Sequence, residues 1–188
     1  MRKLLLTAGL VCALAGALPS RADAQAFITP FAGATFKGDA PASKLTYGAS
    51  FTFMGKAAGL ELDFGYTPDF FNQDQGDVVV VGDNNVTTAM ASLVVGPGDG
   101  PVRPYGVFGA GLIRSALSAT DFFDDVSTND FGVNAGFGVL GKITDHVWVR
   151  GDIRYFRSLQ DPTDDNDVDL TLGKFDFWRG TLGISFHL

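Results

Sequence analysis

The sequence predicts an all-β fold, an eight-stranded antiparallel up-and-down barrel that follows a cleaved signal peptide. Three observations lead to this prediction. The chain opens with a charged and then apolar segment, it continues with stretches in which apolar and polar residues alternate, and the connections between these stretches are alternately short and long. The composition suits a folded domain, because 46% of the 188 residues are hydrophobic and only 19% are charged.

Residues 1–24 have the pattern of a secretory signal peptide. Two basic residues precede an apolar run, and an Ala-Asp-Ala sequence ends at Ala24. The apolar run is short for a membrane-spanning helix. We expect cleavage after Ala24, which leaves residues 25–188 as one barrel domain. Cys12 is lost with the peptide, so disulfides and thiol catalysis are excluded.

The acidic charge balance excludes one class of partner. The full chain has 14 basic and 21 acidic residues, and removing three basic residues and one acidic residue with the peptide leaves 11 and 20, a net charge of −9. The basic residues are scattered, whereas nucleic-acid binding needs them clustered. We therefore expect no nucleic-acid partner.

Five stretches alternate strictly between apolar and polar or glycine residues, which is the pattern of a strand with two different faces. These stretches are 45–53, 58–66, 131–139, 149–155 and 178–188.

Three weaker stretches, 26–36, 86–96 and 104–115, complete a set of eight strands. The first contains Pro30 and the third begins at Pro104. Because proline suits the ends and edges of strands better than their interiors, the facing of the three weaker strands stays open.

The connections indicate the topology. Short turns alternate with long loops, which describes a meander of hairpins with eight strands of about ten residues. The short turns are expected at 55–56, 97–101 and 142–146, and the long loops at 37–44, 67–85, 116–130 and 158–174.

The polar faces of three strands carry charges, and we predict that these charges form a network in the lumen. The third and seventh strands of an eight-stranded barrel stand across from each other, so opposite charges on them would meet inside. Buried charges are tolerated when they are paired. The residues of this network are Glu61, Asp63, Arg150, Asp152, Arg154 and Arg179.

The opposite faces carry large apolar residues, which favours an eight-stranded antiparallel up-and-down transmembrane β-barrel. The alternative is a soluble periplasmic barrel with its charges in water and an apolar ligand inside. Aromatic residues near the expected strand ends favour the membrane reading, because two aromatic girdles mark two interfaces. Toward the long loops these are Tyr66, Phe70, Phe71, Tyr155, Phe175, Phe177 and Trp178; toward the short turns they are Phe53, Trp148 and Phe186.

Three motifs resemble the OmpA-like and OmpX-like eight-stranded barrels of Gram-negative outer membranes. A Pro-Tyr with spaced glycines at 103–111 is similar to a fifth-strand pattern, and the run 131–155 is similar to the sixth and seventh strands. The C-terminal segment looks like the signal read by the barrel-assembly machinery, although it ends in Leu where the family usually has Phe. The residues of this signal are Thr181, Gly183, Phe186 and Leu188.

The resemblance implies localisation in the cell outer membrane, short turns in the periplasm, long loops outside and a closed lumen. It also implies contact with outer-membrane lipid and lipopolysaccharide, and we expect a monomer. It names no loop partner and no single activity.

Few residues could support catalysis. The chain has two histidines, and neither lies where a barrel enzyme would meet lipid in the outer leaflet. Ser185 and His187 share a face, but they are best interpreted as small polar residues of the lumen. We therefore expect no enzyme, no catalytic residues and no cofactor.

The long loops are rich in aspartate. In the whole chain, 20 of the 21 acidic residues are aspartates. The loop residues from Asp161 to Asp169 and from Asp121 to Asp130 could supply oxygen ligands for Ca²⁺. They lack the Gly and the final Glu of an EF-hand loop, and aspartate also favours turns. We predict solvated acidic loops without a defined metal site, and keep divalent-cation binding as the alternative.

The predicted function is structural or interactive, with surface contact through acidic loops and a lumen plugged by the charge network. The alternative is a narrow ion-conducting pore through the same lumen.

Overall fold

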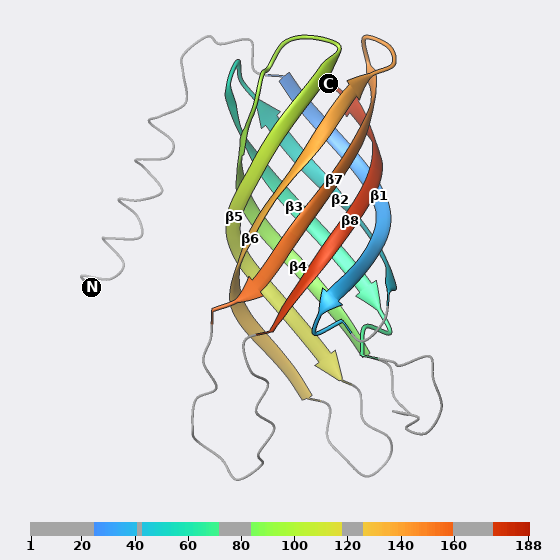
Figure 1. The fold of residues 1–188 in the computed structure, drawn as a ribbon, viewed down its shortest axis with the longest axis vertical. Coiled ribbons are helices and arrows are strands. Elements are labelled where there is room, and N and C mark those ends of the chain that lie inside the picture. Colours follow the sequence, from blue (N-terminus) through green and yellow to red (C-terminus); the bar gives the residue numbers. More distant parts are fainter. Residues whose placement is uncertain (1–24, 41–42, 72–83, 118–125, 160–174) are drawn as a thin grey trace, which may run out of the picture.

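The computed structural model describes residues 25–40, 43–71, 84–117, 126–159 and 175–188. Eight strands close into one antiparallel barrel, in which each strand pairs with its neighbours in the chain and the first pairs with the last (Figure 1). No helix among these residues is long and apolar enough to cross a membrane. The strands are β1 (Gln25–Gly38), β2 (Lys44–Met54), β3 (Ala58–Pro68), β4 (Asn84–Val95), β5 (Val102–Leu117), β6 (Val126–Lys142), β7 (Val147–Ser158) and β8 (Asp176–His187).

All eight predicted strands are confirmed, including the three weaker ones, and each is longer than the expected ten residues. β5 and β6 have 16 and 17 residues and extend beyond the other strands (Figure 1). The expected signal peptide lies outside the described residues, as does most of the acidic loop sequence.

The two ends of the barrel differ as predicted. The connections 55–57, 96–101 and 143–146 lie at one end, together with the C-terminus and the start of β1 (Figure 1). We call this the short-turn end. The longer connections lie at the opposite end, which we call the long-loop end.

Pro30 lies inside a strand, contrary to the expectation that it marks a strand end. β1 pairs with β8 at Phe27 and Ile28 and again from Phe31, with no register pair at Thr29 or Pro30. Proline has no N–H to donate to a neighbouring strand. The hydroxyls of Thr29 and Ser185 lie 2.7 Å apart and join β1 and β8 at this interruption.

The outer wall is apolar and the charged faces point inward. Phe64 and Leu182 are 56% and 70% exposed on the outside, whereas Glu61 and Asp63 are 1% exposed. This facing contradicts the alternative of a soluble barrel with an apolar interior and a charged exterior.

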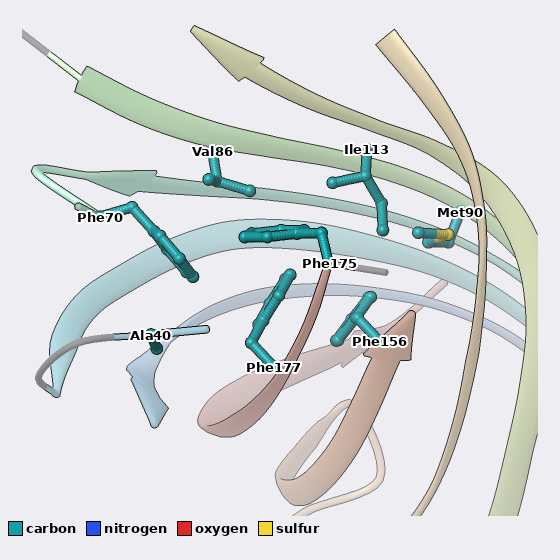
Figure 2. Close-up of a cluster of buried hydrophobic side chains, with 8 residues drawn as sticks. All are labelled: Ala40, Phe70, Val86, Met90, Ile113, Phe156, Phe175 and Phe177. Carbon is teal, nitrogen blue, oxygen red and sulfur yellow. The ribbon is translucent and has the colours of Figure 1, made fainter. Parts of the chain in front are cut away.

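Apolar side chains also fill both ends of the lumen, which the sequence analysis did not predict. At the long-loop end they come from β4, β5, β7 and β8 and from residues next to the ends of β1, β3 and β8, and they gather in one region (Figure 2). The long-loop cluster is Ala40, Phe70, Val86, Met90, Ile113, Phe156, Phe175 and Phe177. The short-turn cluster is Phe27, Met54, Val94, Tyr105, Val107 and Trp148.

The two aromatic girdles were therefore predicted only in part. Phe53 and Phe186 are exposed on the outer wall, as expected. Trp148 and Phe177 are buried in the lumen instead. The reason is the strand period: Trp148 is in phase with the inward Arg150, and Phe177 with the inward Arg179. Phe70 and Phe175, also assigned to the girdle, belong to the long-loop cluster.

Candidate functional site

Six charged side chains lie between the two apolar clusters and form a layer across the lumen. β3 contributes two carboxylates, β7 two guanidiniums and a carboxylate, and β8 one guanidinium. Each of these side chains is at most 7% exposed. The charged layer comprises Glu61, Asp63, Arg150, Asp152, Arg154 and Arg179, the residues of the predicted network.

Glu61 is held by two arginines from the opposite side of the barrel. Nη1 of Arg150 lies 2.5 Å from its Oε2, and Nη2 of Arg154 lies 2.8 Å from its Oε1. The Thr52 hydroxyl donates a hydrogen bond of 2.8 Å to Oε2. Glu61 thus joins β2, β3 and β7.

Asp63 extends the layer to β8. Its Oδ1 accepts a hydrogen bond of 2.6 Å from Nη2 of Arg179, and its Oδ2 lies 3.6 Å from Nη1 of Arg154. Nη1 of Arg179 also donates to the Thr88 hydroxyl at 3.3 Å. Contacts across the lumen therefore link β3, β4, β7 and β8.

Asp152 has more partners than either of the other two carboxylates. Arg154 donates to it from Nε and Nη2 at 3.1 and 2.9 Å, and the hydroxyls of Tyr105 and Thr181 donate at 2.9 and 3.1 Å. The Tyr105 oxygen in turn accepts a 2.6 Å hydrogen bond from Nε of Arg150. Charged groups survive burial when such bonds satisfy them.

Two inward glycines leave room for this layer. A Cβ at Gly138 would overlap the ring of Tyr105, and a Cβ at Gly65 would overlap the guanidinium of Arg179. Small residues on the inner face let large charged side chains cross an eight-stranded lumen.

Sequence reasoning missed two residues of this region, Tyr105 and Arg103. Tyr105 links Asp152 to Arg150, as described above. Arg103 lies at the short-turn end with its guanidinium carbon 4.2 Å from the centre of the Trp148 ring. Both residues are on the inward phase of β5, so the alternation of that strand contained the signal once its facing was known.

The predicted C-terminal signal lies partly inside and partly outside the barrel. Thr181 points to Asp152, and Gly183 pairs with Arg150 and Phe31 on its two sides. Phe186 and Leu188 are exposed.

Ser185 and His187 contact other residues and not each other. The hydroxyl of Ser185 bonds to Thr29, and the ring of His187 lies 5.2 Å from that of Phe27. Among the described residues, no group of three or more His, Cys, Asp or Glu could hold a metal ion. The aspartates at 121–125 and 161–169, considered as oxygen ligands, lie outside the described residues.

The charged layer joins strands on opposite sides of the barrel through ion pairs. Three carboxylates and three guanidiniums balance in charge. Glu61 and Asp63 contact arginines of other strands, whereas the arginines that contact Asp152 lie on its own strand, β7. The pairs between strands fix the cross-section of the barrel.

Comparison with known proteins gives consistent matches. The family model for the outer membrane protein beta-barrel domain matches residues 4–186. No curated protein sequence matches the chain significantly.

Several solved structures share the fold. Neisserial surface protein A has a TM-score of 0.64 and 14% identity, covering 86% of this chain and 96% of its own. The N-terminal barrel of OprF from Pseudomonas aeruginosa has a TM-score of 0.57 and 18% identity, covering 89% and 100%. Ail from Yersinia pestis, in complex with the heparin analogue sucrose octasulfate, has a TM-score of 0.54 and 16% identity, covering 88% and 99%.

Proposed function

Because the chain belongs to the outer-membrane β-barrel domain family, we propose that it is a closed, non-enzymatic barrel that supports the outer membrane and presents surface loops. The protein is located in the outer membrane. The observation that carries the proposal is the charged layer, in which six buried side chains from β3, β7 and β8 meet across the lumen.

The charged layer and the two apolar clusters close the lumen together, because the clusters lie on both sides of the layer. An ion that entered from the long-loop end would first meet the cluster around Phe70 and Phe177, and one from the short-turn end would meet Trp148. An ion loses its water shell in apolar surroundings at a high free-energy cost. We therefore assign the interior to stability and the outer parts to function.

The surface role is assigned to the loops that follow β1, β3, β5 and β7. In this proposal they face the exterior, the short turns face the periplasm, and the protein acts as a monomer assembled by the barrel-assembly machinery. The aspartates of these loops favour cationic partners, or lipopolysaccharide phosphates bridged by divalent cations.

Conductance in planar lipid bilayers tests the closed lumen. The double variant Glu61→Gln/Arg154→Gln removes one carboxylate and one guanidinium that contact each other, so the layer stays balanced in charge. We expect low conductance from the unmodified barrel and a clear increase from the double variant, since neutral side chains hold the lumen less tightly. Lys142→Gln, at the exposed mouth of the short-turn end and outside the charged layer, is the matched control.

Two results would contradict the proposal. Equal conductance of the double variant and the unmodified protein would show that the layer is not the barrier. Stable, high conductance of the unmodified protein would favour the pore. In each case a gel that compares boiled and unboiled samples establishes that the barrel is folded.

A further inference from the structure

A row of polar side chains crosses the outer wall near the long-loop end. Its members lie on five neighbouring strands, and each is the register partner of the next. They share the outward phase of exposed apolar residues such as Phe64 and Leu112. This outer polar row consists of Tyr47 on β2, Tyr66 on β3, Thr87 on β4, Arg114 on β5 and Asn129 on β6.

The outer polar row lies at the boundary of the apolar wall. On β5 the outward positions from Val102 to Leu112 carry only apolar residues, glycine or proline, and Arg114 is the next outward position. From residue 102 to residue 112 a strand rises by about 34 Å, which is about 26 Å along the barrel axis at a tilt of about 40°. The apolar band of a transmembrane barrel is about 25 Å tall. Arg114 therefore lies at the level of lipid headgroups.

Arg114 has no counterion in the barrel wall. Its register partners Thr87 and Asn129 are uncharged, and its guanidinium makes no hydrogen bond or ion pair with the part of the chain that the structure describes. Arg157 also faces outward near the long-loop end, but Asp176 stands opposite it on β8. Arg157 thus has an acidic neighbour, whereas the charge of Arg114 is left for an anion of the membrane.

The other members of the row add hydrogen-bond donors over a wide surface. Tyr66 and Thr87 each carry a hydroxyl, and a guanidinium presents five N–H donors in a geometry that matches phosphate. Four strand spacings, about 19 Å, separate Tyr47 from Asn129. This width exceeds that of a single phosphate and suits a headgroup of linked sugars that carry phosphate.

The wall next to the row suits acyl chains. The next outward row toward the short-turn end has Ala89 between Phe64 and Leu112, and the row after it pairs Ala91 with Ala110. These three alanines form a low strip beside larger apolar side chains. An acyl chain that descends from the outer polar row can lie on this strip and contact Phe64 and Leu112 by dispersion.

We propose that the outer polar row binds lipid A, the phosphorylated and acylated disaccharide of lipopolysaccharide. Arg114 binds one phosphate directly, Tyr66 and Thr87 donate to phosphate or sugar oxygens, and an acyl chain lies over Ala89. The inference rests on the proposed function in one respect, which is that the long-loop end faces the exterior. It differs from the contact proposed for the loop aspartates because no divalent cation lies between the protein and the phosphate.

Native mass spectrometry of the full barrel in detergent, with diphosphoryl lipid A and EDTA, tests the proposal. EDTA removes divalent cations that could bridge carboxylates to phosphates. We expect one lipid A to stay bound to the unmodified protein, and about tenfold weaker binding to Arg114→Gln, since a charge-assisted hydrogen bond is lost. Arg157→Gln should bind like the unmodified protein. Equal losses in the two variants, or no loss in Arg114→Gln, would overturn the proposal.

A second lipid tests the choice of lipid A. Phosphatidylglycerol also carries a phosphate, but it has no sugar headgroup and only two acyl chains. It should bind the unmodified protein more weakly than lipid A does, and equal binding of the two lipids would contradict a glycolipid site. The gel that compares boiled and unboiled samples establishes that each variant is folded.

The orientation is tested separately on intact cells. A maleimide that cannot cross the outer membrane should leave Lys56→Cys, in the turn between β2 and β3, unlabelled. Labelling there would contradict the orientation in the proposed function. Absence of lipid A binding in detergent, where orientation plays no part, would overturn the present inference alone.

Discussion

Nη2 of Arg154 on β7 lies 2.8 Å from Oε1 of Glu61 on β3, and each side chain is at most 1% exposed. β3 and β7 are four strands apart in a closed order of eight, so this ion pair spans the lumen. Since both ions are removed from water, each depends on its partners of opposite charge in the layer for compensation.

The first prediction concerns loss of one partner of this pair. Glu61→Gln removes the carboxylate on β3 that Arg150 and Arg154 both contact across the lumen, and leaves them Asp152 of their own strand. Breaking a buried pair in this way costs about 3–5 kcal/mol. We expect a decrease of this size in the free energy of unfolding, measured by urea titration of the barrel in lipid vesicles.

An exposed ion pair serves as the control. Nζ of Lys142, the last residue of β6, lies 2.6 Å from Oδ1 of Asp145 in the turn that follows, and the two side chains are 38% and 84% exposed. Water screens this pair, so Lys142→Gln should change the unfolding free energy little. A similar loss in both variants would contradict the role given to burial.

The second prediction concerns the Tyr105 hydroxyl, which donates to Asp152 and accepts from Arg150. Tyr105→Phe keeps the ring and leaves two buried charged groups each short of one hydrogen bond. Loss of such a partner costs about 1–3 kcal/mol. The same urea titration should show this decrease, whereas Tyr47→Phe on the outer wall should unfold like the unmodified protein.

The strands and the polar faces could be predicted from the sequence because the inner face of this barrel carries polar and charged residues and the outer face is apolar. A period of two then assigns each residue to a side, and Glu61 and Arg154 fall on the polar faces of β3 and β7. The meander follows from loop length alone, since short connections allow only hairpins.

The aromatic residues could not be placed by their distance from strand ends. Trp148 and Phe186 both lie near the short-turn end, but one points into the lumen and the other outward. The position of each residue in the inward–outward alternation of its strand tells the two apart, whereas its distance from the strand end does not. Pro30 was misleading for another reason: a side-chain bond between Thr29 and Ser185 joins the strands where the proline interrupts the backbone pairing.

The third prediction uses two glycines of neighbouring strands. A Cβ at Gly138 would overlap the Tyr105 ring, whereas the nearest atoms to a Cβ at Gly106 lie 4.0 Å away. Gly138→Ala should therefore displace Tyr105 and lower the unfolding free energy by about 1–3 kcal/mol, the range for an overpacked interior. Gly106→Ala should be neutral or slightly stabilising; the reverse order would mean that Tyr105 does not occupy the space above Gly138.

The fourth prediction distinguishes the two tryptophans by their access to lipid. Trp148 is 3% exposed in the lumen, whereas Trp178 is half-buried on the outer wall with its ring 5.3 Å from that of Tyr155. Lipids with brominated acyl chains quench tryptophans that they touch. In vesicles of such lipids, Trp148→Phe should retain strong quenching because Trp178 remains, and Trp178→Phe should lose most of it. Strong quenching in Trp178→Phe would place Trp148 on the lipid-facing wall, and with it the whole inward phase of β7, which includes Arg150 and Arg154.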